Sequence, residues 1–342
     1  MEAMMYRRLE DGFVRCDLCR HRCTIGKDSS GRCRVRVNMG GELVTLVYGR
    51  VIAEHTDPVE KKPLFHFLPG STTYSIATVG CNFRCRNCQN HGIAQFSPTG
   101  NGTVPGEYVE PSEIVRRAVN AGCSSISYTY TEPTIYFEYA LDTARLARQA
   151  GLKNIFVTNG YITPEALDII APCIDASNID LKGYSANFYN RMAGAALADV
   201  LECIIDYHRR GIWIEITTLV IAGENDSVEQ LAGIAEFIAT KLGSDVPWHL
   251  SRFFPQHQMP NHPVTPASAL AKGVSAARSA GLRFVYEGNF EGGLCDTICP
   301  QCSRGIIKRR GYRSVMSEDF NGSCPGCGSH IAGVFDVTGD GA

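Results

Sequence analysis

The chain has 342 residues, of which 44% are hydrophobic and 20% are charged, and its formal net charge is -2. This length and composition suit one large globular domain with small additions. The near-neutral charge argues against a broad nucleic-acid surface, and the chain has no apolar run of about 18 residues that would span a membrane.

Cysteines are the unusual feature of the composition. There are 15, and the C-x-x-C spacing occurs at Cys16/Cys19, Cys85/Cys88, Cys299/Cys302 and Cys324/Cys327. The first residues lack the apolar core of a secretory signal, so we expect a cytoplasmic protein with metal-bound thiolates rather than disulfides. Cysteine use predicts a Cys-rich N-terminal segment (1–60), a central domain (61–290) and a C-terminal module (291–342).

The N-terminal segment carries four cysteines within about 18 residues, a spacing typical of metal sites. They are Cys16, Cys19, Cys23 and Cys33. Zinc and an auxiliary iron–sulfur cluster both accept four thiolates, and the spacing does not choose between them.

In the central domain, short apolar segments alternate with helical patterns. Strands are predicted at 74–79, 124–129, 153–158, 175–180, 212–220, 247–253 and 283–287. Helices are predicted at 111–120, 134–149, from 163 onward, and at 198–209, 227–241 and 266–279. This alternation predicts a parallel α/β sheet with right-handed crossovers. A full or partial (β/α) barrel fits six or more such units, and an open doubly wound sheet is the alternative. In a barrel the active site lies at the C-terminal ends of the strands.

The first of these strands leads into G-C-N-F-R-C-R-N-C, which contains Cys81, Cys85 and Cys88. Three thiolates can hold three irons of a cubane cluster, and the fourth iron then stays open to a ligand, as in catalytic metal sites. The loop resembles the signature of the radical SAM superfamily. That resemblance implies a [4Fe-4S] cluster that reductively cleaves S-adenosylmethionine (SAM) to a 5′-deoxyadenosyl radical, which abstracts hydrogen from a substrate. Asn87 stands where the superfamily usually has an aromatic residue near the adenine.

Polar residues at the next two strand ends are candidates for SAM binding. Thr131 and Glu132 lie in Y-T-E-P, which resembles the segment that contacts the SAM amine in relatives of pyruvate formate-lyase activases. Thr158 and Asn159 end the following strand, where they can hold ribose or carboxylate groups. A helix cap and a strand–loop turn are the local alternatives for these two segments.

Three further SAM-binding candidates come later in the chain. Asp180 and Lys182 lie on one side of the fourth strand end, because strand side chains alternate. Lys182 can meet the SAM carboxylate, and Asp180 can hold the ribose or Lys182; a surface ion pair is the alternative. His257 is comparable to a histidine near SAM in the activases.

The C-terminal module carries Cys299, Cys302, Cys324 and Cys327, spaced as in a zinc ribbon or rubredoxin-like pair of knuckles. Four soft ligands close the coordination shell, so structural Zn²⁺ is favoured over a second cluster.

The combination of motifs resembles one family over nearly the whole chain. The motifs are the cysteine sets, K-P-L-F-H-F-L-P-G at 62–70, Y-T-E-P at 130–133, D-L-K at 180–182, W-H at 248–249 and Y-E-G-N at 286–289. They resemble the AmmeMemoRadiSam-system radical SAM proteins, relatives of the pyruvate formate-lyase activating enzymes. The resemblance implies a partial (β/α)6 TIM-like barrel with a zinc-ribbon-like C-terminal module.

The same resemblance implies an oxidoreductase that acts on a protein or small organic substrate, with activation of a glycyl-radical enzyme as one candidate reaction. An electron donor such as flavodoxin or ferredoxin, and AMMECR1-like and Memo-like proteins, are the implied partners. Two alternatives remain. One is radical SAM modification of RNA or nucleotides. The other is a non-catalytic iron–sulfur or zinc metalloprotein, an electron carrier or scaffold, which requires a fourth protein ligand at the central loop.

Overall fold

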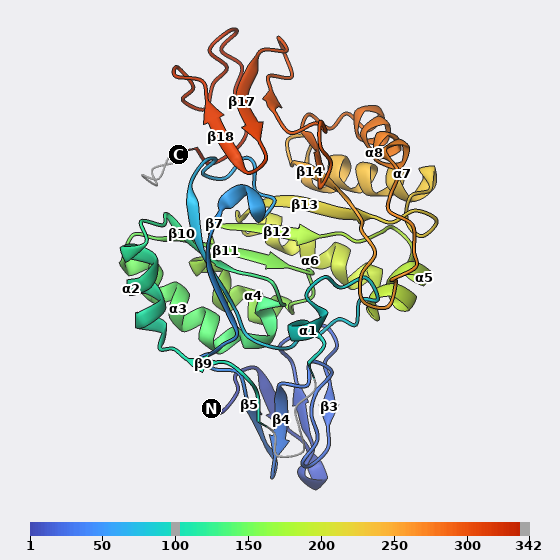
Figure 1. The fold of residues 1–342 in the computed structure, drawn as a ribbon. Coiled ribbons are helices and arrows are strands. Elements are labelled where there is room, and N and C mark those ends of the chain that lie inside the picture. The colour runs from blue at the N-terminus through green and yellow to red at the C-terminus, as the bar shows by residue number, and fades with distance from the viewer. Residues whose placement is uncertain (97–102, 336–342) are drawn as a thin grey trace.

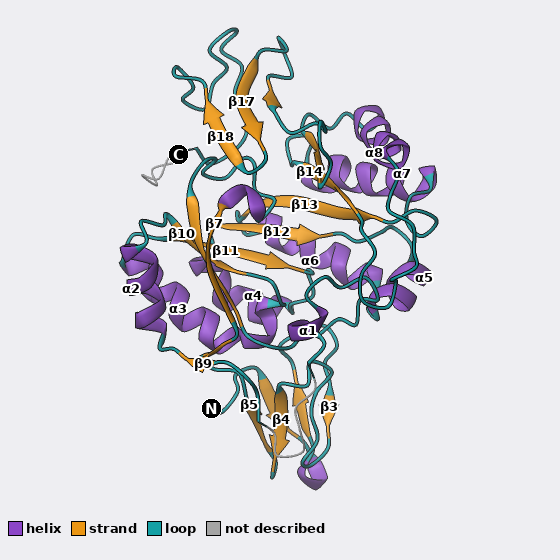
Figure 2. Ribbon diagram, viewed as in Figure 1, coloured by secondary structure: helices purple, strands orange, loops and turns teal. Residues whose placement is uncertain are grey.

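An eight-stranded sheet forms the centre of the computed structural model, which describes residues 1–96 and 103–335 (Figures 1 and 2). Seven strands are parallel and lie side by side in chain order. They are β8 (Thr72–Ala77), β10 (Ser125–Tyr128), β11 (Lys153–Thr158), β12 (Ala176–Asp180), β13 (Trp213–Val220), β14 (Trp248–Arg252) and β15 (Val285–Gly288). Each overlaps one of the seven predicted strands.

Six helices connect successive parallel strands, and they cover the outside of the sheet (Figure 2). They are α2 (Pro111–Asn120), α3 (Phe137–Gln149), α4 (Pro164–Ile170), α6 (Leu197–Arg209), α7 (Val228–Phe237) and α8 (Ala267–Ser279). A doubly wound sheet would reverse its strand order at a switch point, whereas this order advances steadily from β8 to β15. The predicted α/β class with a parallel sheet is confirmed, as a partial (β/α) barrel.

The edge of the sheet beside β8 is occupied by β7 (Ala53–Pro58), which runs antiparallel to it. Residues 53–58 fall within the range assigned to the N-terminal segment, and their sequence A-E-H-T-D-P has no apolar alternation that would predict a strand. No ladder joins β7 to β15 in the described parts of the chain, so the barrel is open there.

Small antiparallel sheets project from opposite sides of the barrel in Figure 1, the N-terminal ones in blue and the C-terminal one in red. The N-terminal strands are β1 (Tyr6–Arg8), β2 (Val14–Cys16), β3 (Thr24–Ile25), β4 (Arg36–Met39), β5 (Glu42–Thr45) and β6 (Arg50–Val51), with β6 paired to β9 (Glu107–Tyr108). The C-terminal strands are β16 (Thr297–Ile298), β17 (Gly305–Arg310) and β18 (Arg313–Met316).

Short helical segments complete the chain. They are η1 (Glu10–Gly12), η2 (Val59–Lys61), α1 (His91–Ala94), η3 (Pro133–Tyr136), η4 (Ala171–Cys173), α5 (Ala186–Phe188), η5 (Tyr189–Ala193) and η6 (Ile238–Leu242). Within residues 1–96 and 103–335, none of the helices has the length and apolar character that crossing a bilayer requires.

The segment 62–70 closes the barrel at the end where the strands begin. The Glu215 carboxylate, early in β13, accepts hydrogen bonds from the backbone N–H groups of Phe65 (2.9 Å) and His66 (2.8 Å) and lies 2.6 Å from Nε2 of His249 in β14. All of these side chains except Phe65 are almost completely buried. The opposite end, where the strands finish, is therefore the end available for an active site.

Candidate active site

The loop that carries Cys81, Cys85 and Cys88 follows β8 at the C-terminal edge of the parallel strands. Gly80 opens the loop with a φ of 102°, and a Cβ there would lie 2.9 Å from Val35 Cγ1, so glycine is needed for this close approach. Two backbone hydrogen bonds hold the loop. The N–H of Arg84 donates to the carbonyl of Ala193 (2.8 Å), and the N–H of Arg86 donates to the carbonyl of Met192 (2.9 Å).

The three thiols are partly buried. Burial raises the pKa of the Cys81 thiol well above its usual value, that of Cys85 to about 11, and that of Cys88. A metal core supplies the positive charge that stabilises buried thiolates. The backbone N–H of Phe83 also donates to Cys81 Sγ (3.4 Å). This donor set fits an iron–sulfur cluster.

Two asparagines beside Cys81 have unused hydrogen-bonding atoms. Nδ2 of Asn159, after β11, lies 3.8 Å from Cys81 Sγ and donates to Oδ1 of Asn82 (2.7 Å). Oδ1 of Asn159 and Nδ2 of Asn82 are buried and have no partner among the residues that the structure describes. Buried polar atoms normally have hydrogen-bond partners, so these two atoms are suited to bind a polar ligand beside the loop that carries Cys81, Cys85 and Cys88, which we call the cluster loop.

Glu132 joins the ends of β10 and β11. Its buried carboxylate accepts from the N–H (3.1 Å) and hydroxyl (2.6 Å) of Thr134, the hydroxyl of Thr158 (2.8 Å) and the N–H of Asn159 (2.8 Å). Burial raises its pKa despite these hydrogen bonds. Thr131 likewise donates to the carbonyl of Thr78 (2.8 Å). The four predicted residues thus lie together, but the side chains of Thr131, Glu132 and Thr158 are engaged within the protein.

The predicted pair at the end of β12 is formed, with Lys182 Nζ 2.7 Å from Asp180 Oδ2. Burial alone would lower the Lys182 pKa, but the charges of Asp180 and of the Cys85 thiolate outweigh it and raise that pKa. Lys182 is therefore a cation held beside the cluster loop, where it can face a carboxylate.

His257 lies in a loop after β14 that crosses the cluster loop. The backbone N–H of Gln258 donates to the carbonyl of Arg86 (3.0 Å), and the His257 ring stacks on His91, with 4.4 Å between the centroids. His257 also has a φ of 54°, which is uncommon for a residue other than glycine. All the candidate SAM residues thus lie at or after the C-terminal ends of strands, and their contact with SAM remains a prediction.

A buried ionic group that joins β7, the segment 62–70 and the side chain of Tyr130 was not predicted from the sequence. Lys62 Nζ lies 2.6 Å from Asp57 Oδ2 and 4.7 Å from the centre of the Tyr130 ring, and Tyr130 also hydrogen-bonds Asp57. Burial lowers the Lys62 pKa to about 8. Tyr130 adjoins Thr131, so the group flanks the SAM candidates. Its only sequence signal is a pair of charges in segments with no element pattern.

The C-terminal cysteines form a compact centre. The sulfurs of Cys299, Cys302, Cys324 and Cys327 all lie within 4.8 Å of one another, with 3.7 Å between 299 and 327 and 3.5 Å between 302 and 324. Four Zn–S bonds of about 2.3 Å in a tetrahedron separate the sulfurs by about 3.8 Å. The geometry therefore fits one metal ion of the size of zinc.

Comparison with known proteins adds the family. The sequence model of the Radical SAM superfamily matches residues 75–238. The chain is 40% identical over 333 residues to the uncharacterized protein MJ0808 of Methanocaldococcus jannaschii, covering 96% of this chain and 98% of that one. It is 25% identical over 187 residues to MJ1632 of the same organism, provisionally named a glycyl-radical enzyme activating enzyme, covering 54% of this chain and 68% of that one.

Among solved structures, Streptococcus suis SuiB superimposes with a TM-score of 0.50 at 14% identity, over 68% of this chain and 52% of SuiB. SuiB has also been solved with S-adenosylmethionine. This likeness concerns the fold.

Proposed function

Because this chain belongs to the radical SAM superfamily, we propose that it cleaves SAM at a [4Fe-4S] cluster held by Cys81, Cys85 and Cys88. When bound, the cluster and SAM supply reductive cleavage to a 5′-deoxyadenosyl radical, which abstracts hydrogen from the substrate. The observation that carries this proposal is the loop itself: three partly buried thiols on one loop at the C-terminal ends of the barrel strands.

The surrounding residues would bind and orient SAM. Lys182, fixed by Asp180, would face the SAM carboxylate, and the free Oδ1 of Asn159 would accept from the SAM amine. Thr158 and Glu132 would act by holding Asn159 in place, because they lie in one hydrogen-bonded group with its backbone. Thr131 and His257 would border the same site.

We further propose a protein or small organic substrate and a reaction of the glycyl-radical activase type. The provisional name of MJ1632 supports this choice. SuiB has been solved with its precursor peptide SuiA, so a peptide substrate has a precedent on this fold. An electron donor such as flavodoxin or ferredoxin is required in this proposal, and AMMECR1-like and Memo-like proteins are candidate partners.

The C-terminal cysteines are proposed to hold structural Zn²⁺. Four thiolates leave no coordination position for a substrate, and the sulfur separations match a single ion.

The test of SAM cleavage is formation of 5′-deoxyadenosine by anaerobically reconstituted protein with dithionite and SAM. Cys85→Ala is expected to form none, because two thiolates cannot hold the cluster in its catalytic state. Cys173→Ala, which removes a thiol from η4 outside all three sets, is the matched control and is expected to match the wild type. Equal product from wild type and Cys85→Ala would refute the proposal, and a cluster spectrum unchanged by SAM would favour an electron carrier.

A further inference from the structure

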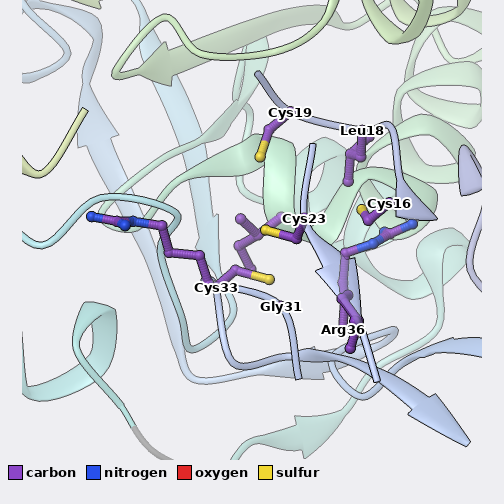
Figure 3. A pocket seen from close by; sticks show the side chains of 10 residues that line it. Cys16, Leu18, Cys19, Cys23, Gly31, Cys33 and Arg36 are labelled. Carbon is purple, nitrogen blue, oxygen red and sulfur yellow. The ribbon is translucent and has the colours of Figure 1, made fainter. Parts of the chain in front are cut away.

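The N-terminal cysteines surround a single pocket (Figure 3). Cys16 and Cys33 are buried, Cys19 and Cys23 are partly buried, and all four line the pocket together with Leu18, Ile25 and Ile135. Its empty volume, including the opening to solvent, is about 320 Å³.

An unpartnered buried N–H group points to an occupant that accepts a hydrogen bond. Arg36 also lines the pocket and is 1% exposed (Figure 3). Its terminal nitrogens bond Glu138 (2.9 and 3.0 Å) and the carbonyl of Met4, but its Nε is buried and has no partner in the described part of the chain. A buried N–H is normally satisfied, and the sulfur atoms of an anionic metal–thiolate group would accept from it.

The spacing of the sulfurs distinguishes a cluster from a single ion. Among residues 1–96 and 103–335, the C-terminal set is the only group of three or more His, Cys, Asp or Glu residues whose ligand atoms all lie within 4.8 Å. The N-terminal thiols do not meet this limit, although all four face one pocket. A zinc ion draws its sulfurs to about 3.8 Å, whereas a cluster of several iron and sulfide atoms holds its thiolates farther apart.

The segment that forms the pocket is in contact with the cluster loop of the candidate active site. His21, between Cys19 and Cys23, has Nε2 2.9 Å from the carbonyl oxygen of Asn82. The carbonyl oxygen of Cys33 lies 3.2 Å from where a Cβ on Gly80 would be. The N-terminal segment therefore packs against the backbone on both sides of Cys81.

We propose that Cys16, Cys19, Cys23 and Cys33 ligate a second iron–sulfur cluster of the [4Fe-4S] type. Four protein thiolates saturate its irons, so this cluster binds no SAM, and Arg36 Nε donates to one of its sulfurs. The inference goes beyond the proposed SAM cleavage and does not depend on it.

The test uses the full chain with Cys81, Cys85 and Cys88 all changed to alanine, which removes the SAM cluster. After anaerobic reconstitution we expect this triple variant to keep about four iron and about four acid-labile sulfide per chain, with the Mössbauer spectrum of a [4Fe-4S] cluster. The wild type should hold about twice as much, and the double variant Cys16→Ala/Cys33→Ala should lose the N-terminal share, because two thiolates cannot hold a cluster. Cys173→Ala is the control that should equal the wild type.

Two results would overturn the inference. One is a triple variant without sulfide that instead holds about two zinc per chain, one in each four-cysteine set. The other is a folded triple variant whose metal consists of the C-terminal ion alone. A single rubredoxin-like iron at the C-terminal cysteines would contain no acid-labile sulfide, so the sulfide assay distinguishes it from a cluster. Absence of 5′-deoxyadenosine from the wild type would refute the SAM proposal and leave this inference standing.

Discussion

Single side chains around Cys81 decide what the cluster loop can bind. The pairing of Asn159 with Asn82 uses one atom of each amide and leaves the other atom of each unpartnered within the described residues. An unsatisfied buried polar atom costs about 1–3 kcal/mol, and a ligand that supplies the missing partner recovers it. These atoms therefore favour a bound molecule with donors and acceptors, such as the amino acid end of SAM.

Asn159→Ala tests this role. We expect the dissociation constant of SAM to rise about tenfold, because one hydrogen bond of about 1.4 kcal/mol is lost. The measurement is a SAM titration followed by the EPR signal of the reduced cluster. Iron content should be unchanged, and the exposed Asn321→Ala in the C-terminal module should bind SAM as the wild type does. Unchanged affinity in Asn159→Ala with an intact cluster would remove Asn159 from the SAM site.

At the scale of elements, the segment 62–70 connects the barrel to the C-terminal module. Within it, Nδ1 of His66 lies 2.7 Å from the carbonyl oxygen of Ala332 and Nε2 lies 2.6 Å from the hydroxyl of Tyr286. A carbonyl only accepts and a hydroxyl can donate, so this geometry suits a neutral ring with the proton on Nδ1. Burial lowers the His66 pKa to about 4, against an ordinary value of 6.5.

This lowered pKa makes stability depend on pH. Between about pH 6.5 and 4 the unfolded chain binds a proton at residue 66 that the folded chain does not. The contribution of the neutral His66 ring to the free energy of unfolding is therefore complete above pH 6.5 and decreases as the pH is lowered. From pH 7 to 5.5 we expect a loss of about 1 kcal/mol in the free energy of unfolding, and His66→Gln should lack this part of the loss. Urea unfolding at the two pH values measures it. His208→Gln, on the exposed face of α6, is the control; equal pH dependence in all three proteins would contradict the assignment.

The C-terminal module is expected to depend on its metal. Cys324→Ala removes one of four ligands, and structural zinc contributes of the order of 10 kcal/mol in small domains. We predict loss of about one zinc per chain and faster amide exchange in β17, with no change in SAM-cluster absorbance. Cys295→Ala removes a nearby thiol outside the compact centre and should keep its zinc. Retention of zinc by Cys324→Ala would disprove the assignment.

At the scale of the whole molecule, buried arginines attach both modules to the barrel. Arg36 of β4 pairs with Glu138 of α3, and both side chains are nearly inaccessible. Arg309 of β17 lies 4.2 Å from the centre of the Phe65 ring and donates to the Phe65 carbonyl (2.7 Å). Removing one charge of the Arg36–Glu138 pair leaves the other charge buried without its partner, which costs more free energy than the pair itself contributes.

Glu138→Gln is therefore expected to lower the free energy of unfolding by about 3–5 kcal/mol. Asp168→Asn breaks the solvent-exposed pair with Arg210 and should cost at most about 1 kcal/mol. Denaturant unfolding compares the two. The double variant Arg36→Met/Glu138→Leu, which leaves neither charge, should recover part of the loss; similar stability of both single variants would show that the buried pair does not hold the module.

The sequence alone determined those features that depend on neighbours along the chain. Strand and helix periodicity, the T-P-E start of α4 and the cysteine spacings are local, so the parallel α/β fold and the three cysteine sets could be read directly. Contacts between distant segments were decided only by the tertiary structure. They include the pairing of the irregular segment 53–58 with β8, the engagement of Glu132 by the end of β11, and the approach of His21 to Asn82. The distances between the cysteine sulfurs were also decided only by the tertiary structure. The sequence gives the number of residues between two cysteines, whereas the choice between a single ion and a cluster depends on where folding places their side chains.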